Sequence, residues 1–235
     1  MIRFRFSIRV LLLIVGVFCI FIGWYVRLVE RQRKAVEWIE RIGGYVVYED
    51  EIDLDGTPFF GGAPQRLNYH STSWTRRLLF VFGDDYISPV IEVHIRDVSI
   101  EDMGNLESFE NLELLNLTGS RFSGSPEIPT LPKLKWLSLS ETKLNDLHGI
   151  RNLANLQTLF LDGSSVSDVS DVAQLKKIEF LSLDYTRVSE LSPIFSLPNL
   201  KFFSCAGLGL EESQMSHLRL NLPPKCDLAN DWRSN

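Results

Sequence analysis

Residues 134–155 read LKWLSLSETKLNDLHGIRNLAN, and their apolar side chains recur at offsets 0, 3, 5, 10, 13, 16 and 19 from Leu134. The same spacing returns 22 residues later as LQTLFLDGSSVSDVSDVAQLKK and 22 residues earlier as LELLNLTGSRFSGSPEIPTLPK. Six such frames begin at Val90, Leu112, Leu134, Leu156, Ile178 and Leu200. Of their 42 frame positions 38 are apolar, although only 45% of the whole chain is apolar. A fixed period of this length predicts a solenoid whose repeats bury their apolar side chains against one another.

The start of each frame, LxxLxL followed by a small polar residue, resembles the leucine-rich repeat. The 22-residue length is similar to the short class seen in internalins and in a protein-phosphatase regulatory subunit. The resemblance covers residues 90–221 and implies an α/β solenoid with a parallel sheet on its concave face. One departure is offset 8, where the family usually has Asn. The residues at this offset are Val98, Ser120, Thr142, Ser164, Thr186 and Leu208. We expect the four hydroxyls among them to bond the turning backbone instead.

Each frame predicts one short strand at offsets 2 to 5. Because strand side chains alternate, offsets 3 and 5 are expected in the core. The return path is too short for a full helix, so single helical or 3₁₀ turns are expected on the convex side. Acids recur at offset 12, as Asp102, Asp146, Asp168, Glu190 and Glu212. We expect each to accept backbone N–H bonds at the start of a turn, with a cation-binding ladder as the alternative. Misses at Ser213, Ser216 and Arg219 indicate that the pattern frays in the last frame.

The N-terminal segment is basic and then strongly apolar. Residues 1–9 contain three Arg, and residues 10–26, VLLLIVGVFCIFIGWYV, carry no charge. This run is near the short limit for a membrane span, and Trp24 and Tyr25 at its end suit the membrane interface. No A-x-A-like triplet follows, so we interpret residues 10–26 as an uncleaved transmembrane signal anchor. A cleaved signal peptide and a buried core helix are the alternatives.

The side of the membrane on which the body lies is open. Five basic residues closely follow the span and three precede it, which favours a cytoplasmic body. The order of segments resembles bacterial signal-anchored leucine-rich repeat proteins, which implies a body outside the cytoplasm. We favour the exported body, because the positive-inside rule tolerates such close counts.

Two segments join the span to the repeats. Residues 27–43 predict a helical stalk whose apolar stripe, Val29, Val36, Ile39 and Ile42, either dimerises or packs on the part that follows; we favour packing. Residues 44–89 predict an N-terminal cap with a strand at 45–48, an acidic turn at 49–56 and a helix at 74–82. The acidic turn departs from a calcium loop, because its twelfth position is Gly62 and not a bidentate Glu.

The predicted C-terminal cap and tail occupy residues 222–235, where residues 226–228 suggest a last half-strand. Cys205 lies at the inward offset 5, and Cys226 follows 21 residues later, so the two are expected near each other on neighbouring strands. A disulfide would suit an oxidising compartment, whereas cysteine is also a common buried apolar residue.

Charge and motifs exclude several functions. Residues 1–42 have a net charge of +5 and residues 43–235 a net charge of −11, and an acidic body repels nucleic acid. The four histidines lack metal-ligand spacing, and the chain has no P-loop, no G-x-S-x-G and no Gly-rich nucleotide fingerprint. We therefore predict no enzyme activity, no cofactor, no metal site and no small-molecule substrate.

The concave face is the predicted site. Strand alternation directs offsets 2 and 4 outward, where large apolar side chains gather at Leu114, Trp136, Phe160, Phe180 and Phe202. Exposed aromatic clusters often mark interfaces, but these rings could also cover one another or be covered by the caps. Asp162 and Asp184 are like-charged ladder neighbours at offset 6, an arrangement that a basic partner or solvent screening would relieve.

These features predict a membrane-anchored module that presents its concave face to a partner protein. Leu114, the four aromatic residues and the two aspartates would contact the partner. The alternative is a structural envelope component that has no specific concave ligand.

Overall fold

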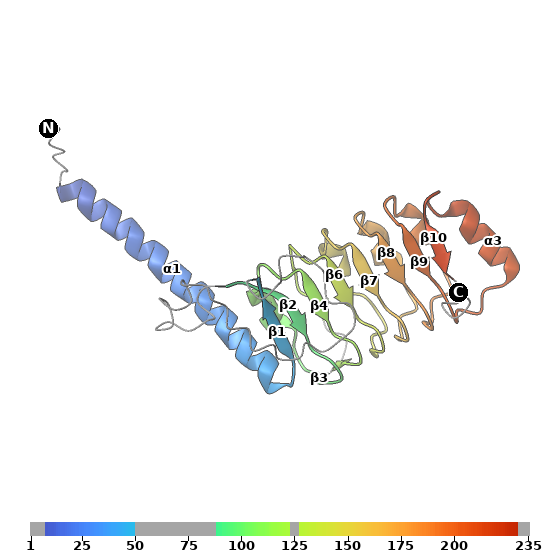
Figure 1. Cartoon of the computed structure of the whole chain (residues 1–235), viewed down its shortest axis with the longest axis horizontal. Helices are drawn as coiled ribbons and strands as arrows, with labels where there is room; N and C mark the ends of the chain where they lie inside the picture. The colour runs from blue at the N-terminus through green and yellow to red at the C-terminus, as the bar shows by residue number, and fades with distance from the viewer. Residues whose placement is uncertain (1–7, 50–87, 123–126, 230–235) are drawn as a thin grey trace.

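The computed structural model describes residues 8–49, 88–122 and 127–229. Helix α1 (Ile8–Arg41) projects from one end of an elongated stack of strands and turns, and helix α3 (Glu212–Asn221) lies at the other end (Figure 1). The predicted helix at 74–82 and nearly all of the acidic turn at 49–56 lie outside the described residues.

One eight-stranded sheet runs through the stack in the order β1-β2-β4-β6-β7-β8-β9-β10. Its strands are β1 (Tyr45–Tyr48), β2 (Val90–His94), β4 (Leu114–Asn116), β6 (Trp136–Ser138), β7 (Thr158–Phe160), β8 (Phe180–Ser182), β9 (Phe202–Ser204) and β10 (Asp227–Ala229). β1 pairs antiparallel with β2, and all later pairs are parallel. Each strand from β4 to β9 is shifted by 22 residues from the strand before it, as the repeat predicts. β10 confirms the expected half-strand.

The core follows the predicted alternation. The residues at offset 3 are Val93, Leu115, Leu137, Leu159, Leu181 and Phe203, and none is more than 1% exposed. The residues at offset 5 are Ile95, Leu117, Leu139, Leu161, Leu183 and Cys205, and none is more than 3% exposed. These two rows form a continuous apolar layer beneath the sheet, so each repeat completes the core of its neighbour.

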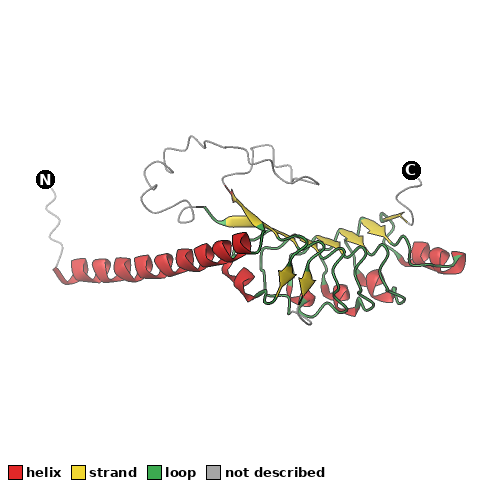
Figure 2. Ribbon diagram, turned by 90° about the horizontal axis from the view of Figure 1, so that it is seen from below, coloured by secondary structure: helices red, strands yellow, loops and turns green. Residues whose placement is uncertain are grey.

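Short 3₁₀ turns lie opposite the sheet (Figure 2). They are η3 (Gly104–Ser108), η4 (Ile150–Asn152), η5 (Ser170–Gln174) and η6 (Ser192–Ser196). A small two-stranded sheet, β3 (Ser99–Ile100) with β5 (Arg121–Phe122), joins the first two repeats at their edge.

The acids at offset 12 act as caps in four repeats. The backbone N–H groups of Gly104, Ser170 and Ser192 donate to Asp102, Asp168 and Glu190 at 2.8–2.9 Å, and that of His148 donates to Asp146 at 3.3 Å. The last repeat differs. Its acid, Glu212, already lies inside α3, and Glu211 caps the helix through a reciprocal pair with Gln214.

Helix α3 explains why the repeat frays. The buried residues of this helix are Met215 and Leu218, which lie three residues apart as an amphipathic helix requires. The polar residues Ser213, Ser216 and Arg219 interrupt the 22-residue frame because the segment follows a helical period there.

The hydroxyls at offset 8 bond the turning backbone in three of the four middle repeats. Ser120, Thr142 and Thr186 donate to the carbonyls of Ile95, Leu139 and Leu183 at 3.1, 2.6 and 2.8 Å. The same expectation is wrong for Ser164, whose buried hydroxyl has no hydrogen-bond partner in the described part of the chain.

Helix α1 has two different halves. Its apolar first half is exposed throughout, so the alternative of a buried core helix for residues 10–26 is wrong. In the second half Val29, Val36 and Ile39 are buried, and the helix packs against β1 and η3. The stripe therefore contacts the body of the same chain and is not free to dimerise.

The two cysteines of the C-terminal repeats are free thiols, so the disulfide is not formed. Cys205 is buried, and its Sγ lies 3.8 Å from the carbonyl oxygen of Ala229. The Sγ of Cys226 lies 3.8 Å from the carbonyl oxygen of Asp227. Burial, with a smaller contribution from a nearby aspartate in each case, raises the pKa of both thiols to about 11.

Candidate interaction face of the sheet

The site is built on the face of the sheet that points away from the core. We call it the open face; it consists of the residues at offsets 2, 4 and 6 from Leu114 to Ala206, on the side predicted to be concave. Side chains reach it because the leucines between them point inward. Phe180 is the most exposed of its aromatic residues at 43%, and Trp136, Phe160 and Phe202 are partly buried.

The four rings form two pairs. The ring centroids of Trp136 and Phe160 lie 5.5 Å apart at an interplanar angle of 52°, and those of Phe180 and Phe202 lie 6.3 Å apart at 32°. The rings thus cover one another in part, as the alternative interpretation holds. The indole Nε1 of Trp136 is shielded from solvent and has no acceptor among the described residues. Buried donors without an acceptor are rare in folded proteins.

Leu114 does not have the expected exposure. Its strand position points it to the open face, yet it is only 8% exposed. Its neighbours on the adjoining strands are Glu92 and Trp136, two longer side chains on the same face. Directly opposed side chains in a sheet lie close enough for long residues to cover a shorter one, so little of Leu114 remains available to a partner.

The two aspartates bond to their own sheet. Asp184 is only 8% exposed, and its Oδ1 accepts from the Ser204 hydroxyl at 2.6 Å and from the Ala206 N–H at 2.7 Å. Asp162 Oδ1 accepts in the same way from the Ser182 hydroxyl and from the Asp184 N–H. Asp184 therefore presents little surface to a partner. The hydrogen bonds to the neighbouring repeat offset the repulsion between the two carboxylates.

Asp162 keeps more freedom than Asp184. It is partly exposed, and within the described ranges its second oxygen, Oδ2, accepts only one long hydrogen bond, from Ser140 Oγ at 3.5 Å. Burial raises the pKa of Asp162 above the usual carboxyl range, the Ser182 hydrogen bond opposes that shift, and the negative charge of Asp184 adds to it. This carboxylate is thus partly desolvated and retains acceptor capacity on Oδ2.

Tyr185 is an exposed aromatic residue that the sequence pattern does not single out. It follows Asp184 directly, it is 56% exposed, and its backbone has a φ of 56°, which is rare for a bulky residue. Offset 7 is left-handed in all six repeats, with Asp97, Gly119, Glu141, Gly163, Tyr185 and Gly207 at this position. A Cβ on Gly207 would lie 2.3 Å from the Tyr185 ring, so the ring lies over that glycine. The alternation of glycine with larger residues at offset 7 is the signal that points to Tyr185.

A titratable cluster lies at the N-terminal end of the sheet. The rings of Tyr45 and His94 stack with centroids 4.5 Å apart, and His94 Nε2 lies 3.2 Å from Glu92 Oε2. Burial raises the pKa of Tyr45, Arg96 lowers it and Glu92 raises it further. These contacts tie β1 to β2.

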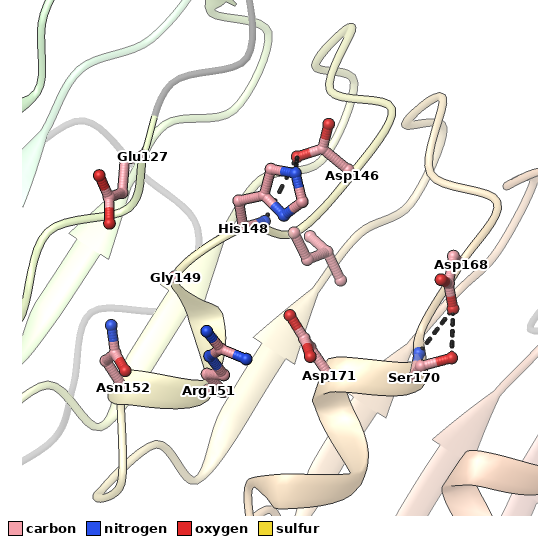
Figure 3. A pocket seen from close by; sticks show the side chains of 10 residues that line it. Glu127, Asp146, His148, Gly149, Arg151, Asn152, Asp168, Ser170 and Asp171 are labelled. Carbon is pink, nitrogen blue, oxygen red and sulfur yellow. Dashed lines mark hydrogen bonds and ion pairs between the residues drawn. The ribbon is translucent and has the colours of Figure 1, made fainter.

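A hollow of about 660 Å³ lies on the side of the 3₁₀ turns (Figure 3). The side chains around it include Glu127, Asp146, His148, Arg151, Asp168 and Asp171. Two of its acids already accept hydrogen bonds that start turns, from the backbones of His148 and Ser170. No group of three or more His, Cys, Asp or Glu in the described ranges could hold a metal ion.

Comparisons with known proteins give only distant likenesses. No protein-family model and no curated protein matches the chain. Among solved structures, an internalin from Listeria monocytogenes is 17% identical, with a TM-score of 0.43, over 66% of this chain and 53% of that one. Internalin C2 from the same organism is 18% identical, with a TM-score of 0.39, over 61% and 75%. A leucine-rich repeat protein from Leptospira interrogans is 24% identical, with a TM-score of 0.38, over 53% and 44%. The chain thus spans about half the length of the first internalin.

The fold follows from the chain's own geometry. Its 22-residue period places one parallel strand in each repeat, buries the leucines of LxxLxL beneath the sheet and returns the chain through 3₁₀ turns on the opposite side. The sequence frame and this arrangement together show that the chain has a leucine-rich repeat fold.

Proposed function

We propose that the chain is a membrane-anchored module that binds a partner protein through the open face. The observation that carries the proposal is the group of aromatic residues there. Phe180 is 43% exposed, and Trp136, Phe160 and Phe202 lie partly exposed on the same face. Aromatic residues on a rigid surface lose little conformational entropy on binding and are enriched at interaction hot spots.

Helix α1 supports the anchor. It runs without a break for 34 residues, and its most apolar stretch has a mean hydropathy of 2.4 and no buried residue. The uncharged run ends at Val26, and Val29 is already buried. Three helical residues span about 4.5 Å, so the body would lie beside the membrane surface.

The open face can be tested by site-specific photocrosslinking in the native cell. A photoreactive amino acid at Thr158 is expected to crosslink a defined protein, because Thr158 lies on the open face between Trp136 and Phe180. The matched control carries the same amino acid at Glu107, an exposed residue of η3 on the turn side. Phe180→Ala should abolish the crosslink from Thr158. Equal crosslinking from both positions, or none from either, would support the structural envelope component instead.

The membrane side can be tested by protease treatment of cells whose cytoplasmic membrane is intact. Following the resemblance to signal-anchored proteins, we propose that the body lies outside the cytoplasm. Digestion of the repeats in intact cells is the expected result. Protection until the membrane is opened would place the body in the cytoplasm, in agreement with the Lys and Arg counts.

A further inference from the structure

Aromatic residues surround Thr158 on the open face. Thr158 is the one small residue in the row of offset 2 between Trp136 and Phe202, and its ladder neighbours are Trp136 and Phe180. Phe160 follows two residues later on the same face of the same strand. Three aromatic side chains therefore border a position that carries only a short side chain.

A carboxylate follows Thr158 and Phe160 in the same repeat. Asp162 lies two residues beyond Phe160 on the open face, a separation of about 6.6 Å along an extended chain. Its Oδ1 accepts hydrogen bonds from the Ser182 hydroxyl and the Asp184 N–H, while Oδ2 accepts, from the described residues, only the long bond from Ser140. Oδ2 therefore keeps capacity to accept a further hydrogen bond.

Among the described residues, none supplies a cation for this carboxylate. In the described ranges Asp162 forms no ion pair with Lys or Arg. Two lysines at the start of the strands pair with other carboxylates, Lys135 with Glu113 at 2.7 Å and Lys201 with Glu179 at 2.6 Å. The whole segment 43–235 has a net charge of −11, so it attracts basic partners.

We propose that this part of the open face binds an arginine side chain on a basic segment of the partner protein. The inference rests on the proposed function and adds the chemistry of the partner. The guanidinium and its stem lie along the aromatic border of Thr158, and the guanidinium donates to Oδ2 of Asp162. Arginine fits better than lysine because its planar group stacks on aromatic rings and donates from a rigid fork.

The raised pKa of Asp162 gives the proposal a second readout. Partial burial without a cation disfavours the charged carboxylate, and a bound guanidinium would favour it. Binding of an arginine peptide should therefore strengthen as the pH rises through the pKa of free Asp162. It should also weaken with added salt.

The test begins with a displayed library of random twelve-residue peptides. The library is selected on the full chain in detergent micelles and counter-selected on the Phe180→Ala variant. The expected result is a set of peptides with arginine beside apolar residues. Neutral or acidic peptides that depend on Phe180 would overturn the arginine inference and leave the proposed function standing. A library with no Phe180-dependent peptide would count against both.

One selected peptide is then synthesised with arginine and with its neutral isostere citrulline. We expect citrulline to weaken binding about tenfold or more, as loss of a charge-assisted hydrogen bond does. Asp162→Asn should weaken the arginine peptide to a similar degree and leave the citrulline peptide unchanged. The control is Glu107→Gln, which removes the same charge from the turn side and should change neither affinity. An equal response of Asp162→Asn to both peptides would overturn the assignment.

The Asp162→Asn variant is suited to this experiment because Asn retains an oxygen for the Ser182 hydroxyl and the Asp184 N–H. Its unfolding midpoint in urea should lie close to that of the unmodified chain, so a loss of affinity can be assigned to the charge.

Discussion

Two adjacent residues of β8 point to opposite sides of the sheet, Leu181 into the core and Phe180 to the open face. Leu181 is 1% exposed and lies in the inward row, whereas Phe180 is 43% exposed. The ring centroid of Phe180 lies 6.3 Å from that of Phe202. Leu181→Ala should lower the free energy of unfolding by about 3 kcal/mol, the usual loss for a buried leucine. Phe180→Ala should lower it by about 2 kcal/mol, from the loss of an aromatic pair and of the partial burial of the ring.

The comparison is matched because both substitutions are in the same strand of the same repeat. In a solenoid, stability is a sum of repeat and neighbour terms, so each variant disturbs the same two interfaces. Urea unfolding followed by far-UV circular dichroism gives both losses, provided that the slopes agree between variants. Equal losses would refute the alternation that exposes Phe180, and with it the main anchor of the proposed interface.

Three further predictions concern the backbone, the core and a titratable group. Gly207→Ala should lower the free energy of unfolding by about 2 kcal/mol or more, because φ is +74° and an aromatic ring lies over the site. Gly209 has a similar φ of +67° but open space around it, so Gly209→Ala should lower it by about 1 kcal/mol. Urea unfolding measures both losses. Ser164→Ala should leave the unfolding midpoint unchanged or raise it, whereas Thr186→Val should lower stability by about 1 kcal/mol, since only Thr186 has a hydroxyl partner. A raised pKa means that folded Asp162 binds its proton more tightly than the unfolded chain does. Protonation of Asp162 therefore stabilises the fold at acidic pH, and this contribution is lost as the pH rises through the pKa of the folded state. Asp162→Asn should flatten the dependence of the urea unfolding midpoint on pH in that range.

The repeat predicts the fold well because one physical constraint acts six times. Each frame must bury offsets 3 and 5, so a period of 22 residues fixes the strand register from Leu115 to Phe203 without information about distant contacts. The constraint weakens after β9, where the described residues contain no further complete 22-residue frame. There a helix that buries Met215 and Leu218 replaces the 3₁₀ turn.

The open face is less predictable, because outward direction is not the same as exposure. Strand alternation correctly places Leu114 and Phe180 on one face, but it does not show that long neighbours cover Leu114. It also does not show that Asp184 bonds to the next strand, since those partners are a hydroxyl and a backbone N–H about 20 residues away. Sequence periodicity gives the direction of a side chain, and the adjoining repeats determine how much of it remains accessible.

The anchor and the open face together restrict the kind of partner we propose. Helix α1 joins the proposed span to the body in one piece, and Ile39 near its end belongs to the same core as the first repeat. A rigid helix without an intervening loop limits how far the body can move from the membrane. A basic segment that binds beside Asp162 must then come within the length of the solenoid from the membrane surface. A second membrane protein meets this condition at all times, whereas a freely diffusing protein meets it only on encounter, so the effective concentration favours a partner in the same membrane.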